Sequence, residues 1–421
     1  MKETKPHIVH DPRMQGFARR HTVKAALAWL DAQLHPLDAE DVPLRTAAGR
    51  VLASLVVSDI DVPGFDRATM DGYAVVADST EGATPYNRVA LKVIGDALPG
   101  APFTSALARG DAVRIMTGAP MPAGSDAVLP AEFVDIVESG SGGNTPDVFA
   151  VFSVSPGKNI GQRGEDIVRG AELLDVRRVL RPQDIGVMSS IGLANAQVFR
   201  RPRVRLVITG NELLPTGSPP LGFQITDANG PMLAALAERD GAIVDFPGLV
   251  RDDAEAIRAA LHADADVVIV SGGSSVGIED LAPSLVATHG ELAVHGIAMR
   301  PSSPTGMGRI GHRLIFLLPG NPVSALCAYD FFAGRAIRAL GGRSTEWPYR
   351  SVRGTLARKI SSPIGRLDYA RVRFDNGILE PISVSGASVL SSTTRADGFV
   401  IVDDDSEGFA AGSTVDVWLY A

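Results

Sequence analysis

The sequence predicts a multidomain protein of the α/β plus β class, with a doubly wound α/β domain, a β-rich domain and a C-terminal β-barrel. The chain has 421 residues, which exceeds the size at which one hydrophobic core normally stops growing. From residue 203 onward, strand-like runs such as RVRLVIT, DVVIVSGG and RLIFLLPG alternate with helical patterns, which is typical of a parallel sheet covered on both faces. Short apolar runs separated by Gly, Pro and Asp fill residues 42–155 and recur after residue 344, which indicates two units built from strands.

The predicted helices carry end signals. The first begins after Thr22, a suitable N-cap. Its apolar residues recur at helical spacing, at Val23, Ala26, Leu27 and Leu30. A second has helical spacing in RPQDIGVMSSIGL at 181–193. NPVSALCAYDFFAGRAIRALGG closes the α/β unit as a helix, with Asn321 as N-cap, Pro322 at the first helical position and Gly341 past the end.

Composition excludes several classes of protein. The net charge is −8 and no block of Lys and Arg is long enough for a nucleic-acid surface, and RRPRVR at 200–205 is better interpreted as a solvated linker. A single cysteine, Cys327, excludes an internal disulfide framework and fits a reducing compartment. No segment has the length and apolarity of a signal peptide or a membrane span, so we expect a soluble cytoplasmic protein.

Three strand ends of the predicted α/β unit are rich in glycine and polar residues. They are ITGNELLPTG at 208–217, SGGSSVGIED at 271–280 and LLPGNPVSA at 317–325. Glycine lets a ligand approach the main chain, and the exposed N–H groups can hold an anion. One such loop is most often only a turn, but three at one edge of a sheet indicate a ligand site. None contains GxGxxG or GxxxxGK[ST], which disfavours a dinucleotide fold or a P-loop kinase.

Carboxylates accompany these loops at Glu212, Asp227 and Asp280. Acids beside a phosphate-holding loop would repel the ligand unless a divalent cation lies between them, so the pattern favours Mg²⁺ together with phosphate. The alternative is helix N-capping, since Asp227 and Asp280 both precede predicted helices.

PGFDRATMDGYAV at 63–75 places Met, Tyr and Phe around two acids in a segment too irregular for a strand. Its alternative is a tight turn at Asp71 and Gly72, and the residues alone leave both interpretations open. The scattered histidines form no HxxxH pair, which disfavours zinc, and the absence of GxSxG disfavours a simple esterase.

Taken in order, these motifs resemble the molybdopterin molybdenumtransferase family, which includes MoeA and the E domain of gephyrin. The resemblance covers roughly residues 20–421 and rests on PLRTAAGRVLASLVVSDIDVPGFDRATMDGYAV, RIMTGAPMPAGSDAVLPAE, KNIGQRGEDI, TGNEL, QITDANG, SGGSSVG and LPGNPVSA. It implies an elongated homodimer of four-part subunits. The parts would be a helical linker region at 18–57 and 155–185, a β-rich domain at 58–154, a MogA-like α/β domain at 186–343 and a C-terminal β-barrel at 344–421.

The resemblance also implies a reaction in which adenylylated molybdopterin and molybdate give molybdenum cofactor, AMP and water, assisted by Mg²⁺. The residues that match the family's catalytic positions are Asp71, Asp166, Glu212, Asp227, Asp280 and Arg300, of which Glu212 and Asp280 are expected to be the metal ligands. Those that match its substrate-binding positions are Thr209, Gly210, Ser271, Gly272, Gly273, Ser275, Gly277, Ser303, Pro319, Gly320, Asn321, Pro322, Arg371 and Ser391. The family's cleft lies between the α/β domain of one subunit and the β domain of the other, so Asp71 would act in trans. A transient contact with the molybdopterin adenylyltransferase is also implied, with no nucleic-acid or membrane partner.

The chain departs from the family at its anion site. Lys-Pro-Gly-Lys-Pro of the family is RPSSP at 300–304, so the first cation is arginine and the second is serine. Asn211 replaces an Asp, and Ser274 replaces an apolar residue. Two hypotheses follow: a working insertase that uses Arg300 with Arg371, or a paralogue that binds molybdopterin or finished cofactor as carrier or scaffold without inserting metal. A preference for another oxyanion such as tungstate is a third possibility.

Overall fold

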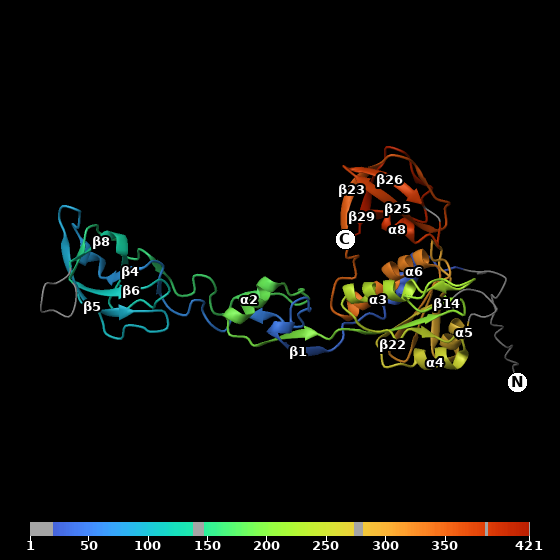
Figure 1. The fold of residues 1–421 in the computed structure, drawn as a ribbon, viewed down its shortest axis with the longest axis horizontal. Coiled ribbons are helices and arrows are strands. Elements are labelled where there is room, and N and C mark those ends of the chain that lie inside the picture. The colour runs from blue at the N-terminus through green and yellow to red at the C-terminus, as the bar shows by residue number, and fades with distance from the viewer. Residues whose placement is uncertain (1–19, 138–146, 273–280, 384–385, 421) are drawn as a thin grey trace, which may run out of the picture.

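The computed structural model describes residues 20–137, 147–272, 281–383 and 386–420. The chain is elongated, with a β-rich unit at one end, a small module in the middle, and an α/β domain and barrel together at the other end (Figure 1). Within the described residues no helix is long and apolar enough to cross a membrane.

The β-rich unit is a six-stranded sheet in the order β7-β4-β6-β5-β9-β8. Its strands are β4 (Gly72–Val75), β5 (Val89–Ala97), β6 (Asp111–Ile115), β7 (Ala127–Pro130), β8 (Val134–Val137) and β9 (Asp147–Ala150), with the short pair β3 (Arg67–Ala68) and β10 (Ile160–Gly161) beside it. Alternate residues of β4 enter two separate hydrophobic clusters, Tyr73 on one face and Ala74 on the other. The sheet therefore packs apolar residues against both of its faces, which is why its strands alternate so weakly in sequence.

The middle module is built from segments far apart in the chain. β1 (Ala39–Pro43) pairs with β12 (Asn195–Phe199), β2 (Val56–Val57) pairs with β11 (Glu172–Leu174), and α2 (Pro182–Ser190) packs against them. Its core includes Leu52, Met188 and Val198. Residues 186–199 thus pack with this module rather than with the α/β sheet; the domain limits stay predictions.

The predicted first helix is confirmed as α1 (Val23–Asp31), and Thr22 Oγ1 accepts a hydrogen bond from the Ala25 amide at 3.1 Å. Its buried residues join the core of the α/β domain and the barrel instead of the middle module.

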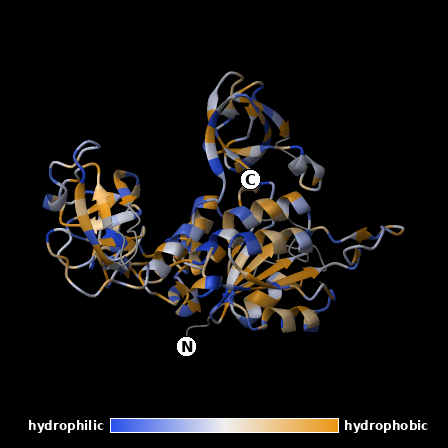
Figure 2. Ribbon diagram, turned by 60° about the vertical axis from the view of Figure 1, so that its left-hand side comes forward, coloured by the Kyte–Doolittle hydropathy of each residue, from blue (hydrophilic) through white to orange (hydrophobic). Residues whose placement is uncertain are grey.

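The predicted doubly wound domain is confirmed, with a seven-stranded sheet in the order β16-β13-β18-β22-β21-β19 and β17 beside β13. The parallel strands are β13 (Arg203–Thr209), β16 (Ile243–Asp245), β17 (Leu249–Val250), β18 (Val267–Ser271) and β22 (Arg313–Leu318), and the antiparallel edge consists of β21 (Gly306–Ile310) and β19 (Glu291–His295). Alternate residues of β13 separate the two layers: Leu206 packs towards α3 (Asn229–Arg239), and Val207 packs towards α4 (Ala254–Leu261) and α5 (Ala282–His289). Figure 2 shows the apolar residues concentrated on these strands, between the helices.

The last helix of the domain is helical over its predicted length but not uniform. It consists of α6 (Pro322–Ala328), a π-helical turn over Tyr329–Ala333, and α7 (Gly334–Leu340), with Gly341 at the C-cap as predicted. All five residues of the π-turn are buried.

The C-terminal unit is a closed barrel, as predicted. Its strands are β25 (Leu367–Asp375), β26 (Ile378–Ser383), β23 (Arg350–Leu356), β29 (Thr414–Leu419) and β27 (Gly398–Val402), and the β25–β27 pairing closes the ring. β20 (Met299–Arg300) leaves the α/β domain and pairs in parallel with β25, which connects the two units. Shorter elements are η1 (Leu44–Thr46), η2 (Ala77–Thr80), η3 (Ala131–Phe133), β14 (Leu213–Leu214), β15 (Ile225–Thr226), β24 (Ile360–Ser361), β28 (Gly408–Phe409) and α8 (Ser391–Thr394).

Candidate active site

The three polar loops predicted from the sequence begin at one edge of the parallel sheet. β13, β18 and β22 end at Thr209, Ser271 and Leu318, and all three strands run in the same direction. The chain leaves β13 for β16 on one side and returns to β18 on the other, so the strand order reverses between β13 and β18. This reversal point, at the carboxyl ends of the strands, is where doubly wound domains bind ligands.

Gly272 brings the ends of β13 and β18 into direct contact. A Cβ at this position would lie 1.9 Å from the Thr209 carbonyl oxygen, and φ of Gly272 is +99°. A Cβ at Gly320, after β22, would lie 3.8 Å from the Gly272 Cα. The main chains of the three loops therefore approach one another with no intervening side chain at these positions.

Asn229 joins two of these loops, although it is not among the residues predicted from the sequence. Its Nδ2 donates to Ser271 Oγ at 2.9 Å and to the Gly320 carbonyl at 2.7 Å. The residue is buried, and its Oδ1 has no hydrogen-bond partner among the described residues. Asn229 belongs to the QITDANG motif, of which only the acid is a predicted site residue. Its position at the start of α3 is the one local signal, but the two loops it contacts are far away in sequence.

Asp227 forms a hydrogen bond to the first turn of α3. Its Oδ1 accepts a hydrogen bond from the Gly230 amide at 2.9 Å, and the residue is buried. This is the contact that the N-capping alternative predicts. A catalytic role for Asp227 stays a prediction.

Glu212 follows the end of β13 and is exposed. Its carboxylate lies against Gly210, where a Cβ would be 2.8 Å from Oε2. The segment around it is held by the parallel pair β14–β15: Glu212 precedes β14 and Asp227 follows β15. The Glu212 carbonyl accepts from the Ile225 amide, and the Asp227 amide donates to the Leu214 carbonyl.

Asp252 is a second site residue that the sequence did not reveal. The Thr209 hydroxyl donates to Asp252 Oδ1 at 3.0 Å, whereas the neighbouring Asp253 caps α4 by accepting from Ala256 at 2.8 Å. Two adjacent acids thus have different roles, one at the strand edge and one in a helix cap. Local sequence cannot separate them, since both stand before the same helix.

Part of the predicted site lies outside the described residues. Gly273, Ser275, Gly277 and Asp280, and with them the substituted Ser274, fall in this segment. Among the residues that the structure describes, no cluster of three His, Cys, Asp or Glu side chains could hold a metal ion. The predicted Mg²⁺ ligands Glu212 and Asp280 therefore remain a prediction.

The turn at 319–322 connects the edge to the barrel. Asn321 is the N-cap residue of α6 and Pro322 its first residue, as predicted, although the Asn321 side chain makes no capping hydrogen bond. Pro319 is buried while Gly320 and Asn321 are exposed. The Val323 amide donates to the Ala387 carbonyl at 3.0 Å, so the start of α6 contacts a barrel loop.

Arg300 is ion-paired within the chain. Its Nη2 contacts Oδ2 of Asp368, a fully buried barrel residue that Arg366 also contacts at 3.2 Å. The Arg300 side chain is 29% exposed, so solvent and a ligand can still reach it. The role of Arg300 towards an anion stays a prediction.

The serines that follow Arg300 pack under α6. Ser302 has φ +94°, and its hydroxyl donates to the Ser324 carbonyl at 2.6 Å. Ser303 Oγ is buried with no hydrogen-bond partner among the described residues, and its carbonyl accepts from Ile297 at 2.8 Å. The segment is thus fixed by its main chain and by the Ser302 hydroxyl.

Arg371 is completely buried between the barrel and α6. A Cβ at Gly386 would lie 3.9 Å from its Nη2. Burial raises the pKa of the Cys327 thiol in α6, and the positive charge of Arg371 acts in the opposite direction. Ser391, the first residue of α8, is exposed. The structure therefore places Arg371 close to the barrel loop at Gly386 and to Cys327 of α6, and it does not place Ser391 in a buried site.

Asp71 directly precedes β4, and the Asp166 amide donates to the Val62 carbonyl at 3.1 Å, between the β-rich unit and the middle module. β4 lies at the opposite end of the molecule from α3 (Figure 1). Asp71 Oδ1 accepts from the amide and the hydroxyl of Thr117, each at 2.7 Å, and these bonds lower the pKa of the Asp71 carboxyl. Gly72 begins β4, where a Cβ would lie 2.1 Å from the Leu129 carbonyl. Within one chain neither acid reaches the edge of the α/β sheet.

Family models match almost the whole described chain. Residues 21–192 match the MoeA N-terminal region (domain I and II), residues 205–339 match a probable molybdopterin binding domain, and residues 353–420 match the MoeA C-terminal region (domain IV).

Full-length relatives show the same similarity. The chain is 36% identical over 389 residues to molybdopterin molybdenumtransferase 2 of Mycobacterium tuberculosis, covering 90% of this chain and 94% of the relative. It is 32% identical to the molybdopterin molybdenumtransferase of Haemophilus influenzae, covering 91% and 94%. A crystal structure of the molybdopterin biosynthesis MoeA protein from Pyrococcus horikoshii superposes with a TM-score of 0.81 at 32% identity, covering 95% of this chain and 99% of that chain.

Proposed function

Since this chain belongs to the MoeA family of molybdopterin molybdenumtransferases, we propose that it catalyses the Mg²⁺-dependent insertion of molybdate into adenylylated molybdopterin, with release of AMP. The observation that carries the proposal is the meeting of three strand ends at the reversal point, joined by Asn229 and packed through Gly272 and Gly320. Exposed main chain of this kind holds phosphate groups.

The edge residues would position the nucleotide and the pterin. Gly272 and Gly320 leave no side chain between the ligand and the main chain. Asn229 keeps the two loops at a constant separation, and its Oδ1 is an acceptor without a partner among the described residues. Such a rigid arrangement lowers the cost of aligning the phosphoanhydride with the incoming oxyanion.

The acids at this edge fit the preferences of Mg²⁺. This ion binds through one or two carboxylates together with substrate phosphates and keeps several waters. Glu212 is an exposed carboxylate at the edge, and Asp280 follows the second loop in sequence. When bound, Mg²⁺ would supply Lewis-acid stabilisation of the charge that develops as AMP leaves. Glu212 and Asp280 would hold the ion, and Asp227 would keep the start of α3 in place.

Two arginines would supply positive charge for molybdate. Arg371 is buried close to Gly386 and Cys327, and Arg300 stands on β20 where the α/β domain meets the barrel. Because Arg300 also contacts Asp368, only part of its charge is available to an anion.

A homodimer would complete the site, with Asp71 supplied in trans from the second subunit. A mixed dimer tests this arrangement: Asp71→Asn in one subunit and Glu212→Gln in the other. One intact site per mixed dimer should restore about half of the activity, whereas each homodimeric variant should be inactive. Inactive mixed dimers would exclude a shared site.

The direct test is turnover. Purified protein with adenylylated molybdopterin, Mg²⁺ and molybdate should release AMP and yield cofactor that activates an apo-enzyme. Absence of AMP release at high molybdate would exclude insertion. Competition between molybdate and tungstate in the same assay would reveal the preferred oxyanion.

A non-inserting carrier or scaffold is the second candidate, and the RPSSP segment favours it. Ser303 contributes no charge, and Arg300 is already paired with Asp368. This candidate predicts binding of pterin or nucleotide without AMP release. Ser303→Lys would then create activity, whereas in a working insertase it would change molybdate affinity only.

A further inference from the structure

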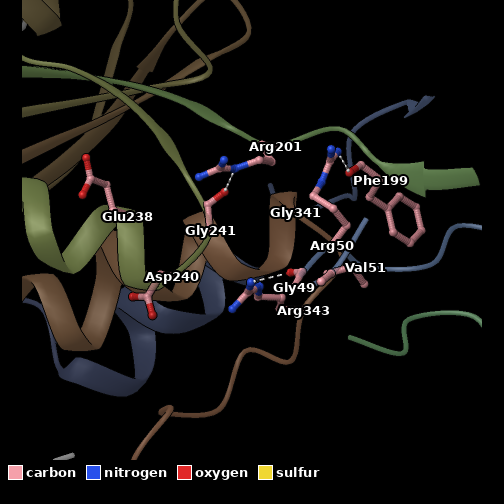
Figure 3. Close-up of a pocket in the computed structure, with 11 residues that line it drawn as sticks. Gly49, Arg50, Val51, Phe199, Arg201, Glu238, Asp240, Gly241, Gly341 and Arg343 are labelled. Carbon is pink, nitrogen blue, oxygen red and sulfur yellow. Dashed lines mark hydrogen bonds between the residues drawn. The ribbon is translucent and has the colours of Figure 1, made fainter. Parts of the chain in front are cut away.

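A cavity of about 200 Å³ lies far from the strand edge, where the middle module meets the α/β domain. The middle module contributes residues 48–51 and Phe199, and the α/β domain contributes Glu238, Asp240, Gly241, Gly341 and Arg343 (Figure 3). Three arginines line it: Arg50, Arg201 and Arg343.

The basic segment at 200–205 explains part of this positive charge. Three of its four arginines have an aspartate partner: Arg200 with Asp266, Arg203 with Asp264, and Arg205 with Asp245. Arg201 instead donates from Nε to the Gly241 carbonyl at 3.0 Å and from Nη2 to the Ala242 carbonyl at 2.6 Å. The segment is therefore not a solvated linker throughout, because Arg201 faces the cavity.

Arg343, like Arg201, donates to a main-chain carbonyl. Its Nη2 donates to the Gly49 carbonyl at 2.9 Å, across the boundary between the two units. Neither Arg201 nor Arg343 forms an ion pair with any residue that the structure describes. Each guanidinium has five N–H donors, so the carbonyl contacts leave donors for a ligand.

The two acids of the cavity do not neutralise these cations. Asp240 is buried and already contacts Arg338 at 2.9 Å and Arg239 at 3.1 Å. Glu238 is exposed, and its side chain points away from the arginines in Figure 3. Arg50 has its own partner in Glu40. Two arginines without an ion-pair partner among the described residues, Arg201 and Arg343, therefore remain at the cavity.

Burial is the main influence on Arg343 and lowers the pKa of its guanidinium. The negative charge of Asp240 partly opposes this shift, and the positive charge of Arg201 adds to it. A bound anion would offset the burial of the Arg343 charge by neutralising it, and would screen the repulsion between Arg343 and Arg201.

We propose that this cavity binds a small oxyanion, a phosphate or a carboxylate, through Arg201 and Arg343. Guanidinium groups present planar donor pairs that match both kinds of anion. Because Arg343 already contacts the middle module at Gly49, a bound anion strengthens the contact between the two units. This site is independent of the insertion reaction and needs neither pterin nor molybdate.

The test titrates the full chain with inorganic phosphate and follows hydrogen exchange. Because phosphate can also bind at the strand edge, the measurement must show which amides become protected. Phosphate should protect amides in 48–51 and 238–243 of the wild-type chain. Arg201→Gln and Arg343→Gln, which keep a donor for the carbonyls, should weaken this protection at least about tenfold in phosphate concentration. Arg258→Gln, an exposed arginine of α4, loses the same charge and should leave it unchanged.

A parallel titration with citrate distinguishes a carboxylate ligand from a phosphate. Protection by either anion that is lost in both cavity variants supports the proposal. Absence of protection by both anions in the wild-type chain, or equal protection in Arg343→Gln and wild type, would overturn it. Circular dichroism and thermal unfolding of each variant verify that it is folded.

Discussion

Gly272 and Ser302 have almost the same φ angle in two different regions of the molecule. Their φ angles are +99° and +94°, in the left-handed region that favours glycine. At the strand edge the residue is glycine, and a Cβ would lie 1.9 Å from the Thr209 carbonyl oxygen. At the junction with the barrel the residue is serine, and its hydroxyl donates to the Ser324 carbonyl at 2.6 Å.

The protein accommodates an unfavourable φ angle in two different ways at these positions. The strand edge requires the absence of a side chain, because two main chains touch there. The junction tolerates a side chain because a buried hydrogen bond offsets the backbone cost, which is about 1–2 kcal/mol for a residue with a Cβ. The junction also relies on a side-chain contact at Arg300, which is paired with Asp368.

Gly272→Ala should have the largest effect. The added Cβ must displace the Thr209 main chain, and the alanine must adopt a left-handed backbone conformation. We therefore expect a loss of about 3–5 kcal/mol in the free energy of unfolding and no AMP release. Chemical denaturation measures the first quantity. Gly311→Ala is the control, since its φ is +61° with no atom within 4 Å of a Cβ. It should cost only about 1 kcal/mol, and equal losses would contradict the contact argument.

Asp368→Asn tests whether the junction depends on its ion pair. Removing a buried carboxylate leaves Arg300 and Arg366 facing a neutral group, and because both arginines are about 30% exposed we expect a loss of about 2–3 kcal/mol. Glu380→Gln breaks an exposed pair with Arg358 in the same barrel and should cost less than about 1 kcal/mol. Similar values for the two variants would mean that burial of Asp368 has no energetic consequence.

Asn229→Ala tests the connection between two loops of the edge. It removes two hydrogen bonds at about 1 kcal/mol each, so we expect a loss of about 2 kcal/mol and a larger relative loss of nucleotide affinity. Unfolding and titration with AMP measure the two effects. Asn195→Ala, at an exposed position of β12, should change stability by less than about 0.5 kcal/mol. An unchanged AMP affinity in Asn229→Ala would separate the edge from nucleotide binding.

Ser302 allows the smallest and most specific comparison. Ser302→Ala keeps the Cβ in the left-handed conformation and removes the hydrogen bond, whereas Ser302→Gly removes both the strain and the bond. We therefore expect Ser302→Ala to be less stable than Ser302→Gly by about 1 kcal/mol. The reverse order, measured by thermal unfolding, would mean that backbone strain at this position is negligible.

The sequence by itself predicted the elements and the place of the site. The N-cap at Thr22, the position of Pro322 at the start of α6 and the strands ending at Thr209, Ser271 and Leu318 depend on near neighbours, so local patterns are sufficient to find them. Glycines at the ends of strands also indicate, by their spacing alone, that backbone or ligand approaches closely there.

Only the tertiary structure decided which partners these residues have. Asp252 contacts Thr209 across 43 positions of sequence, Arg300 contacts Asp368 across 68, and Asn229 contacts Gly320 across 91. The sequence shows four arginines in 200–205 but does not show that, of these four, Arg201 lines a cavity. The physical reason is that the free charge and hydrogen-bonding capacity of a side chain depend on what packing brings beside it, and packing joins segments that the chain keeps far apart.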